Sequence, residues 1–378
     1  MIIFLLLFFA ATFSITSPKS RPAFFLLIAI VYLAIAGNLD NPDRFFYVEN
    51  FEGIKTGDQD ASFEPGYQSL ARIAALLGLD YGAFHFVLTG AALLLICTAI
   101  MELTDRPALG LLAYLFFPFF WDVTQVRNFY AMAIVIYGMK YLLVEQRASN
   151  LKYILLIIVA SMFHITSLFY LLLLGARTKN KLLLWGALGA AALVYTLVFS
   201  TLVASPLLAF VAEKIDVYTT TETSMVTKAA VLAFYGSSLL LLWWSARRMS
   251  VAEAGGFILS PSGAPDASAE KALRRLRTPY LRISPALLLN ANLIAGLSIL
   301  LTLDNLDFIR LYRNIFIIGC IFVINSINLP PRRGRKLLSI SFVAYLFAVF
   351  VGFVYVTATS NIIESTLFGN ILSGRAII

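Results

Sequence analysis

Long apolar segments separated by short polar linkers make up most of this chain. The segments are apolar on all sides rather than on one helical face, which is typical of helices that cross a membrane. The pattern predicts an all-α polytopic membrane protein, with residues 1–378 forming a single transmembrane domain. We expect about ten crossings, at residues 1–16, 23–37, 81–102, 107–121, 126–145, 181–204, 229–246, 286–303, 314–329 and 337–357.

Composition supports the membrane class. Hydrophobic residues make up 60% of the 378 residues, charged residues make up 13%, and the mean hydropathy is +0.84. These values exclude an ordinary soluble domain. Cys97 and Cys320 both fall inside apolar segments, so they are interpreted as core residues rather than a disulfide or metal pair. The first segment lacks a basic leader and is predicted to be a retained span.

Charged linkers predict the orientation. The chain has 29 Lys and Arg against 21 Asp and Glu, a net charge of +8, and we attribute this excess to cytoplasmic loops rather than to nucleic-acid binding. The basic linkers are "SPKSRP", "EQRASNLK", "ARTKNK", "KALRRLR" and "PPRRGRK". Residues 38–66 carry seven acidic against two basic side chains and are placed on the outer side.

A histidine interrupts the apolar run at residues 151–175. Basic linkers flank this run on both sides, so a single crossing would export one of them and invert every later loop. A re-entrant hairpin with arms at 151–162 and 165–175 and a turn at Phe163-His164 keeps both linkers inside. The alternative is one tilted helix with a packed histidine.

Two polar regions lie outside the spans. Residues 38–80 are predicted to be an outer loop with a short interfacial helix beginning beside Glu64, because Pro65-Gly66 breaks the chain there. Residues 246–285 are rich in Gly, Ser, Ala and Pro and predict a flexible basic cytoplasmic loop. No internal repeat is present.

Ionisable residues in or beside a bilayer are candidates for function. Arg127 begins a predicted span on the outer side, where it serves a substrate, lies at the interface or pairs with Asp122. Arg310 and Arg313 share a helix face at i, i+3, which suits a diphosphate. The alternative for these two is pairing with Asp304 and Asp307.

The acidic loop and the hairpin supply further candidates. Glu64 is placed at a helix N-terminus, where it also has an ordinary role as a helix-start residue. His164 is a functional candidate if the hairpin forms, whereas His85 is interpreted as an interfacial residue. An outer site assembled from acids, arginines and a histidine suits phosphate and sugar chemistry. The aromatic side chains that offer surfaces for sugar rings are Tyr47, Tyr67, Tyr130, Tyr312 and Trp121.

The stretches "DNPDRFFYVENF", "FEPGYQSLARIAALLGLDYGAFHFV", "TQVRNFYAMAIVIYGMKYL" and "LKYILLIIVASMFHITSLFYLLLL" resemble the EpsG family of Wzy-like polysaccharide polymerases. The resemblance covers residues 38–175, with a weaker echo at "IRLYRNIFIIG". The positions that carry it are Asp43, Tyr47, Glu64, Pro65, Gly66, Arg127, Phe163, His164 and Ser167. The chain departs from the pattern at Asn128, where the family often has Gln, and in its long loop at 246–285.

The resemblance implies a fold similar to GT-C-type glycosyltransferases and a bacterial inner-membrane enzyme. Such an enzyme joins undecaprenyl-diphosphate-linked oligosaccharide units on the outer face into exopolysaccharide or O-antigen-type polymer. The reaction uses no nucleotide sugar, cofactor or essential metal. Membrane lipids, a chain-length regulator and a flippase are the expected partners.

The site residues follow from this hypothesis. Arg127, Arg310 and Arg313 would stabilise the leaving diphosphate, and His164 is preferred as the general base. Glu64 and Asp43 are the alternative bases. Asp43, Tyr47 and Tyr67 are also expected to bind substrate. The rival functions are an O-antigen-type ligase, a secondary transporter with a buried charge relay, and a structural scaffold.

Overall fold

The computed structural model describes residues 2–57, 63–178, 180, 185–186, 189, 223–256, 281–327, 329, 334–356 and 362–368. The regular elements of these residues are α-helices and 3₁₀-helices. They are α1 (Ile2–Thr16), α2 (Arg21–Ala36), α3 (Arg44–Thr56), α4 (Pro65–Leu76), α5 (Tyr81–Leu103), α6 (Pro107–Leu115), α7 (Pro118–Thr124), α8 (Val126–Leu143), η1 (Glu145–Arg147), α9 (Asn150–Ser161), η2 (Ile165–Arg177), α12 (Met225–Gly256), α14 (Pro285–Ala295), α15 (Leu297–Asp304), η5 (Leu306–Phe308), α16 (Ile309–Arg313), α17 (Phe316–Ile327), α18 (Arg335–Val356) and α19 (Ile362–Phe368).

Prolines and small polar residues set where many of these helices begin. Four helices, α4, α6, α7 and α14, start with proline, which lacks the N–H that a first helical residue leaves unpaired. Ser20, Asp80 and Ser149 each accept a hydrogen bond from a backbone N–H in the first turn of the helix that follows. The helix starts are therefore encoded locally.

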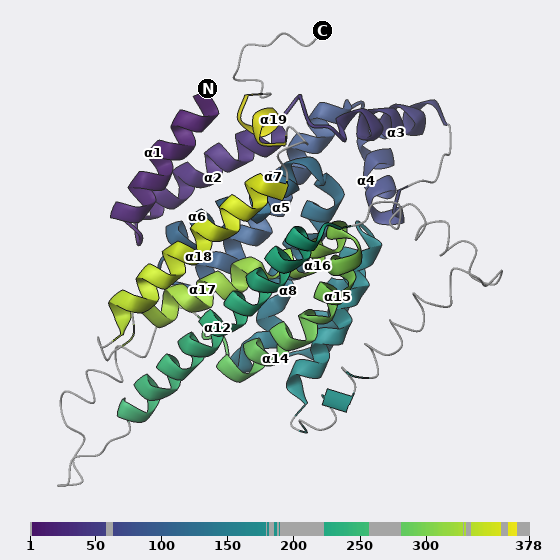
Figure 1. Cartoon of the computed structure of the whole chain (residues 1–378). Coiled ribbons are helices and arrows are strands. Elements are labelled where there is room, and N and C mark those ends of the chain that lie inside the picture. The colour runs from purple at the N-terminus through teal and green to yellow at the C-terminus, as the bar shows by residue number, and fades with distance from the viewer. Residues whose placement is uncertain are drawn as a thin grey trace.

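The long helices pack into a bundle. In Figure 1, α12, α17 and α18 run side by side along it, while α3 and α4 lie together at its edge. α8 lies inside the bundle, packed against α5, α9 and η2. Nearly all of its side chains are buried, including Lys140 near its end, which pairs with Glu102 at 2.8 Å.

Four helices are long and apolar enough to cross a membrane: α5, residues 225–250 of α12, the pair α14–α15, and α18. The helices α6 and α7 make a fifth candidate span, bent by 63° at the break before Pro118. The membrane class is thus confirmed. The count of about ten crossings is not, because the helices α1, α2 and α17, which lie at predicted crossings, are each shorter than a full span. The predicted crossing at 181–204 lies outside the described residues.

The predicted break at Phe163-His164 is present. α9 ends at Ser161 and η2 begins at Ile165, and the arms are joined where the Tyr153 hydroxyl donates to the carbonyl of Tyr170 at 2.8 Å. At the far end of η2, the Arg177 guanidinium donates to the side chain of Asn150, the first residue of α9. The second arm therefore returns to the level at which the first began, as in a hairpin.

The acidic segment at 38–80 contains two helices. α4 stands where a short helix was predicted, and Glu64 is its N-cap residue. α3 was not predicted, because charged and polar residues alternate with its apolar positions and the sequence resembles a polar loop. The outer placement of this segment remains a prediction. α12 continues to Gly256, beyond the expected end of that span at residue 246, and residues 257–280 are outside the described set.

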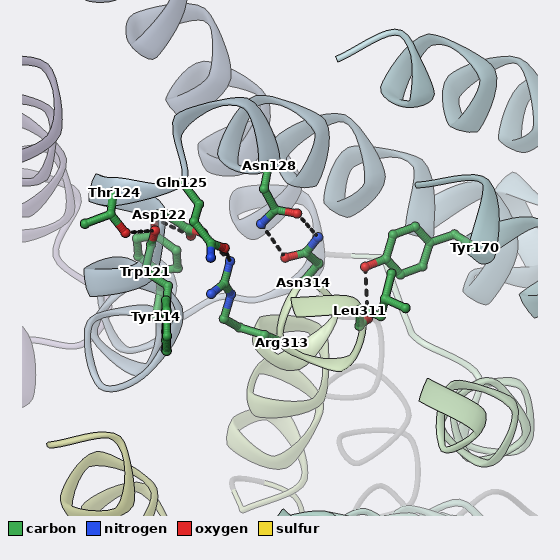
Figure 2. A network of polar contacts seen from close by, with 10 residues as sticks. All are labelled: Tyr114, Trp121, Asp122, Thr124, Gln125, Asn128, Tyr170, Leu311, Arg313 and Asn314. Atoms are coloured by element: carbon green, nitrogen blue, oxygen red, sulfur yellow. Dashed lines mark hydrogen bonds and ion pairs between the residues drawn. The ribbon is translucent and has the colours of Figure 1, made fainter. Parts of the chain in front are cut away.

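A buried ion pair joins the broken helices to α16 (Figure 2). Arg313 donates to Asp122 at 3.4 Å and to the side-chain oxygen of Gln125 at 3.0 Å. Asp122 also accepts a hydrogen bond from the Tyr114 hydroxyl at 3.0 Å. The Arg313 and Asp122 side chains are 1% and 0% exposed. Each charge depends on the other, because neither is hydrated.

An amide pair continues this network. The side chains of Asn128 in α8 and Asn314 at the end of α16 exchange two hydrogen bonds, of 3.2 and 3.1 Å. The Tyr170 hydroxyl of η2 then donates to the carbonyl of Leu311 at 2.9 Å. Together these contacts hold α16 between the start of α8 and the hairpin.

Replacing Arg313 with methionine is expected to destabilise the protein by about 3–5 kcal/mol, because the Asp122 carboxylate is left buried without its cation. Thermal unfolding in detergent measures this. Arg247→Met is the matched control, since Arg247 is exposed and stacks on Trp243 at 4.0 Å. Loss of this stacking should lower the free energy of unfolding by about 1 kcal/mol at most. Combining Arg313→Met with Asp122→Asn should recover part of the loss; a double variant no more stable than Arg313→Met would contradict the pairing.

Candidate functional site

Three charged or polar side chains from separate parts of the chain meet beside the hairpin turn. Glu64 caps α4, Arg127 lies in the first turn of α8, and His164 lies in the turn between α9 and η2. Arg127 Nη1 donates to Glu64 Oε2. His164 Nδ1 lies 3.2 Å from Glu64 Oε1. The central carboxylate thus contacts both other residues, one with each oxygen.

Local geometry explains why Glu64 faces the hairpin. Its backbone is extended (φ −66°, ψ 148°) and its side chain forms no capping bond within α4. The carboxylate instead accepts a hydrogen bond from the backbone N–H of Ile165, the first residue of η2, at 3.3 Å. In return, the N–H groups of Gly66 and Tyr67 in α4 donate to the carbonyl of Met162, at 2.9 and 3.3 Å. The end of α9 thereby accepts from two N–H groups that α4 leaves unpaired, and Glu64 at the start of α4 accepts from the first N–H of η2.

The electrostatic setting of Glu64 and His164 favours a carboxylate beside a neutral imidazole. Burial on its own raises the pKa of Glu64, but the hydrogen bond with His164 and the charge of Arg127 outweigh it, and the pKa falls to about 2. Burial lowers the pKa of His164 below 6.5, while the bond to Glu64 acts in the opposite direction. Both residues lie outside the candidate spans.

The protonation of His164 follows from this contact. Because the Glu64 carboxylate can only accept, Nδ1 of the neutral ring carries the proton and Nε2 carries the lone pair. Nε2 is buried and has no hydrogen-bond partner among the described residues. Buried polar atoms are nearly always paired in folded proteins. This nitrogen therefore has capacity to accept one further hydrogen bond.

Arg127 is held by more than its ion pair. Its guanidinium lies 3.9 Å from the centre of the Phe63 ring. The side chain is 23% exposed, compared with 15% for Glu64 and 12% for His164. Within the described part of the chain, Arg127 Nε is also buried without a partner. The guanidinium thus keeps an unused N–H donor after pairing with Glu64.

Two residues of the acidic segment lie on the Arg127 side of this cluster. Burial raises the pKa of Asp43, the residue before α3, while the charge of Arg127 acts to lower it. Burial likewise raises the pKa of Tyr47, against the opposite effect of Arg127. The Tyr47 ring packs on those of Phe63 and Tyr67, with centroids 5.6 and 6.2 Å apart. Asp43, Tyr47 and Tyr67 therefore gather near Arg127.

The two predicted diphosphate-binding arginines differ in their surroundings. The charge of Arg310, which lies in α16, acts to lower the pKa of His164. Arg313 instead lies in the buried network with Asp122 and Gln125. Asp122, which the sequence offered as a partner for Arg127, is thereby occupied by Arg313.

Sequence reasoning missed several polar residues around this site. Asp122 was considered only as a partner of Arg127, and the pairing of Asn128 with Asn314 was not expected. Polar amides inside apolar stretches are the signal that was available. His85, which was set aside, is buried between the Tyr130 hydroxyl at 2.7 Å and the carbonyl of Ile35 at 3.2 Å. Its ring is thus fully hydrogen-bonded.

The donor set at the site does not suit a metal ion. The described residues contain no group of three or more His, Cys, Asp or Glu side chains arranged to hold one. The cluster at Glu64 has one carboxylate and one imidazole together with Arg127, whose positive charge opposes a bound cation. Its donors and charges are better suited to an anion and to proton transfer.

Comparison with known protein families assigns this chain to one of them. Neither a curated protein nor a solved structure matches the chain. The model of the EpsG family matches residues 22–367, which include the acidic segment, the hairpin and α16. The match covers nearly the whole chain, so the protein belongs to the EpsG family of Wzy-like polysaccharide polymerases.

Proposed function

We propose that this protein joins lipid-diphosphate-linked oligosaccharide units into a polysaccharide on the outer face of the bacterial cytoplasmic membrane. The observation that carries the proposal is the contact of Arg127, Glu64 and His164, which brings an anion-binding group and a proton acceptor to one place. Family membership supports a polymerase acting on a lipid-linked substrate. Undecaprenyl diphosphate is the proposed carrier.

In the proposed reaction, a hydroxyl of one lipid-linked unit attacks the anomeric carbon of the other. The new glycosidic bond forms as the bond to the diphosphate breaks. His164 Nε2 takes the proton of the attacking hydroxyl, and the diphosphate departs with the bonding electrons. Glu64 acts by positioning: it fixes the ring through Nδ1 and stabilises the imidazolium that forms.

The cationic groups stabilise the leaving group in this scheme. Arg127 contacts Glu64 from α8, and the charge of Arg310 in α16 acts on the pKa of His164, so we assign the leaving group to these two cations from different helices. A preorganised donor that meets developing charge contributes on the order of 3 kcal/mol to catalysis. Arg313 supports this arrangement indirectly, because its ion pair with Asp122 holds in place α16, the helix that carries Arg310.

The acidic segment supplies the proposed sugar-binding surface. Tyr47 and Tyr67 are both buried in an aromatic cluster. The Tyr67 hydroxyl is buried and has no hydrogen-bond partner in the part of the chain that the structure describes. In this proposal, a hydroxyl of the sugar supplies the hydrogen-bond partner that the Tyr67 hydroxyl lacks. Asp43 is the proposed carboxylate partner for a second sugar hydroxyl.

Alanine substitution at His164 is expected to lower the polymerisation rate by roughly 10²- to 10⁴-fold, because the attacking hydroxyl loses its base. Arg127→Ala should lower it by about 10²- to 10³-fold through loss of leaving-group stabilisation. Gel separation of lipid-linked glycans from cells with matched protein abundance measures both effects, with single repeat units accumulating.

Arg72→Ala is the control for these variants, because Arg72 is exposed on α4 and away from the contacts that define the site. Arg72→Ala should give the same series of lipid-linked glycan bands on the gel as the wild type, the wild-type ladder. A wild-type ladder from His164→Ala or Arg127→Ala would overturn the proposal. Loss of transfer to a final acceptor, with lipid-linked chains of normal length, would indicate a ligase instead.

The pH dependence of the rate gives an independent check. The proposed base must be neutral, and burial places the pKa of His164 below 6.5. The rate should therefore be constant from pH 7 down to about 6.5 and fall only at lower pH, as the ring takes up a proton. Glu64 stays ionised through this range because its pKa is about 2. Initial rates with purified protein and lipid-linked substrate measure the profile. A rate that rises as the pH falls below 6.5 would contradict it.

A further inference from the structure

We infer that Gly66 is a positioning residue, whose missing side chain allows α4 to dock on the hairpin turn and hold His164 against Glu64. The inference rests on the proposed function, in which that contact orients the base. It assigns to Gly66 a role in catalysis although the residue does not touch substrate.

The space beside Gly66 is filled by the hairpin backbone. A Cβ at this position would lie 2.6 Å from Met162 Cβ, 2.7 Å from the Met162 carbonyl oxygen and 3.0 Å from its carbonyl carbon. Two of these three atoms belong to the main chain, so a rotamer change cannot relieve the overlap. Any other residue must therefore move the hairpin turn away from α4.

The lack of room for a side chain, rather than the backbone conformation, explains why position 66 is a glycine. Gly57 and Gly78, which flank the two helices of the same segment, have φ of 81° and 74° and open space around their Cα atoms. Glycine is required at those two positions because the turn needs a left-handed backbone conformation. Gly66 has no positive φ, since only Gly57, Gly78 and Gly334 do among the described glycines. The close approach of Met162 is thus the physical reason for a glycine at position 66.

Three hydrogen bonds depend on this approach. Gly66 and Tyr67 donate their N–H groups to the Met162 carbonyl, and Ile165 donates to the Glu64 carboxylate. The contact of His164 Nδ1 with Glu64 is formed by the same two segments. Arg127 belongs to α8 and reaches Glu64 from another direction. Displacing the hairpin therefore separates His164 from Glu64 while it leaves the ion pair with Arg127.

The test is Gly66→Ala in the full-length protein. A displacement near 1 Å is expected to lower kcat on the order of 10²-fold, because the base is misplaced. KM for the lipid-linked substrate should change little, since Arg127 keeps its partner. Gly236→Ala is the matched control: a Cβ there meets nothing within 4 Å, and its kinetics should equal those of the wild type.

A titration distinguishes positioning from a general structural defect. The charged groups facing His164 are Glu64 from α4, Arg127 from α8 and Arg310 from α16. The bond to Glu64 raises the pKa of the ring, whereas the two arginines lower it. Gly66→Ala should therefore move the acid limb of the rate profile to lower pH. The imidazole NMR signal of His164 should shift in the same way, and the chain has only one other histidine, His85.

A second variant covers the case in which Gly66→Ala is not recovered from membranes. Ile165→Pro removes the N–H that donates to Glu64 and suits the first position of η2, because His164 before it is already extended (φ −154°, ψ 113°). It should reduce the rate and shift the titration in the same direction. Unchanged kcat and an unchanged titration in the variant that is recovered would overturn the positioning role, even with His164→Ala inactive. Normal polymer from His164→Ala would overturn the proposed function itself.

Discussion

Backbone groups exposed by a helix break inside an apolar protein must find partners within the protein, and the whole arrangement depends on this constraint. At the hairpin turn the Met162 carbonyl is satisfied by Gly66 and its neighbour. At the other end of the hairpin, Arg177 donates to the carbonyl of Leu142, near the end of α8. Arg248 likewise donates to the carbonyl of Ser326 in the last turn of α17 and to that of Leu329, beyond the end of the helix. Polar side chains thus stand where the helices are interrupted.

Two ionic clusters meet this constraint in different ways. The pair of Arg313 and Asp122 lies in a network whose two charged side chains are both fully buried. The cluster of Arg127, Glu64 and His164 is partly exposed and includes a buried ring nitrogen without a partner in the described chain. A fully buried network holds helices in register, whereas a partly exposed one has access to a bound molecule. This difference is why we assign chemistry to the second cluster.

The sequence was sufficient for the parts that depend on local rules. Basic linkers on both sides of residues 151–175 predicted the hairpin, and Glu64, Arg127 and His164 were all named as candidates. Their mutual contacts were not predicted, because they join residues 63 and 100 positions apart and depend on packing. The pairing of Asp122 with Arg313 was missed for the same reason. The number of crossings was not confirmed by the described helices, since apolar composition does not reveal where a helix is too short to span.

The winding of η2 determines how far the hairpin reaches. Its thirteen residues form a 3₁₀-helix, which rises about 2.0 Å per residue and so extends about 26 Å. Wound as an α-helix, the same residues would extend only about 20 Å. This winding makes the second arm about 6 Å longer than an α-helix of the same residues would be. Because Arg177 is tied to α8 and α9 at one end, a change in the winding of η2 would move Ile165, and with it the backbone N–H that donates to Glu64, along the axis of the hairpin.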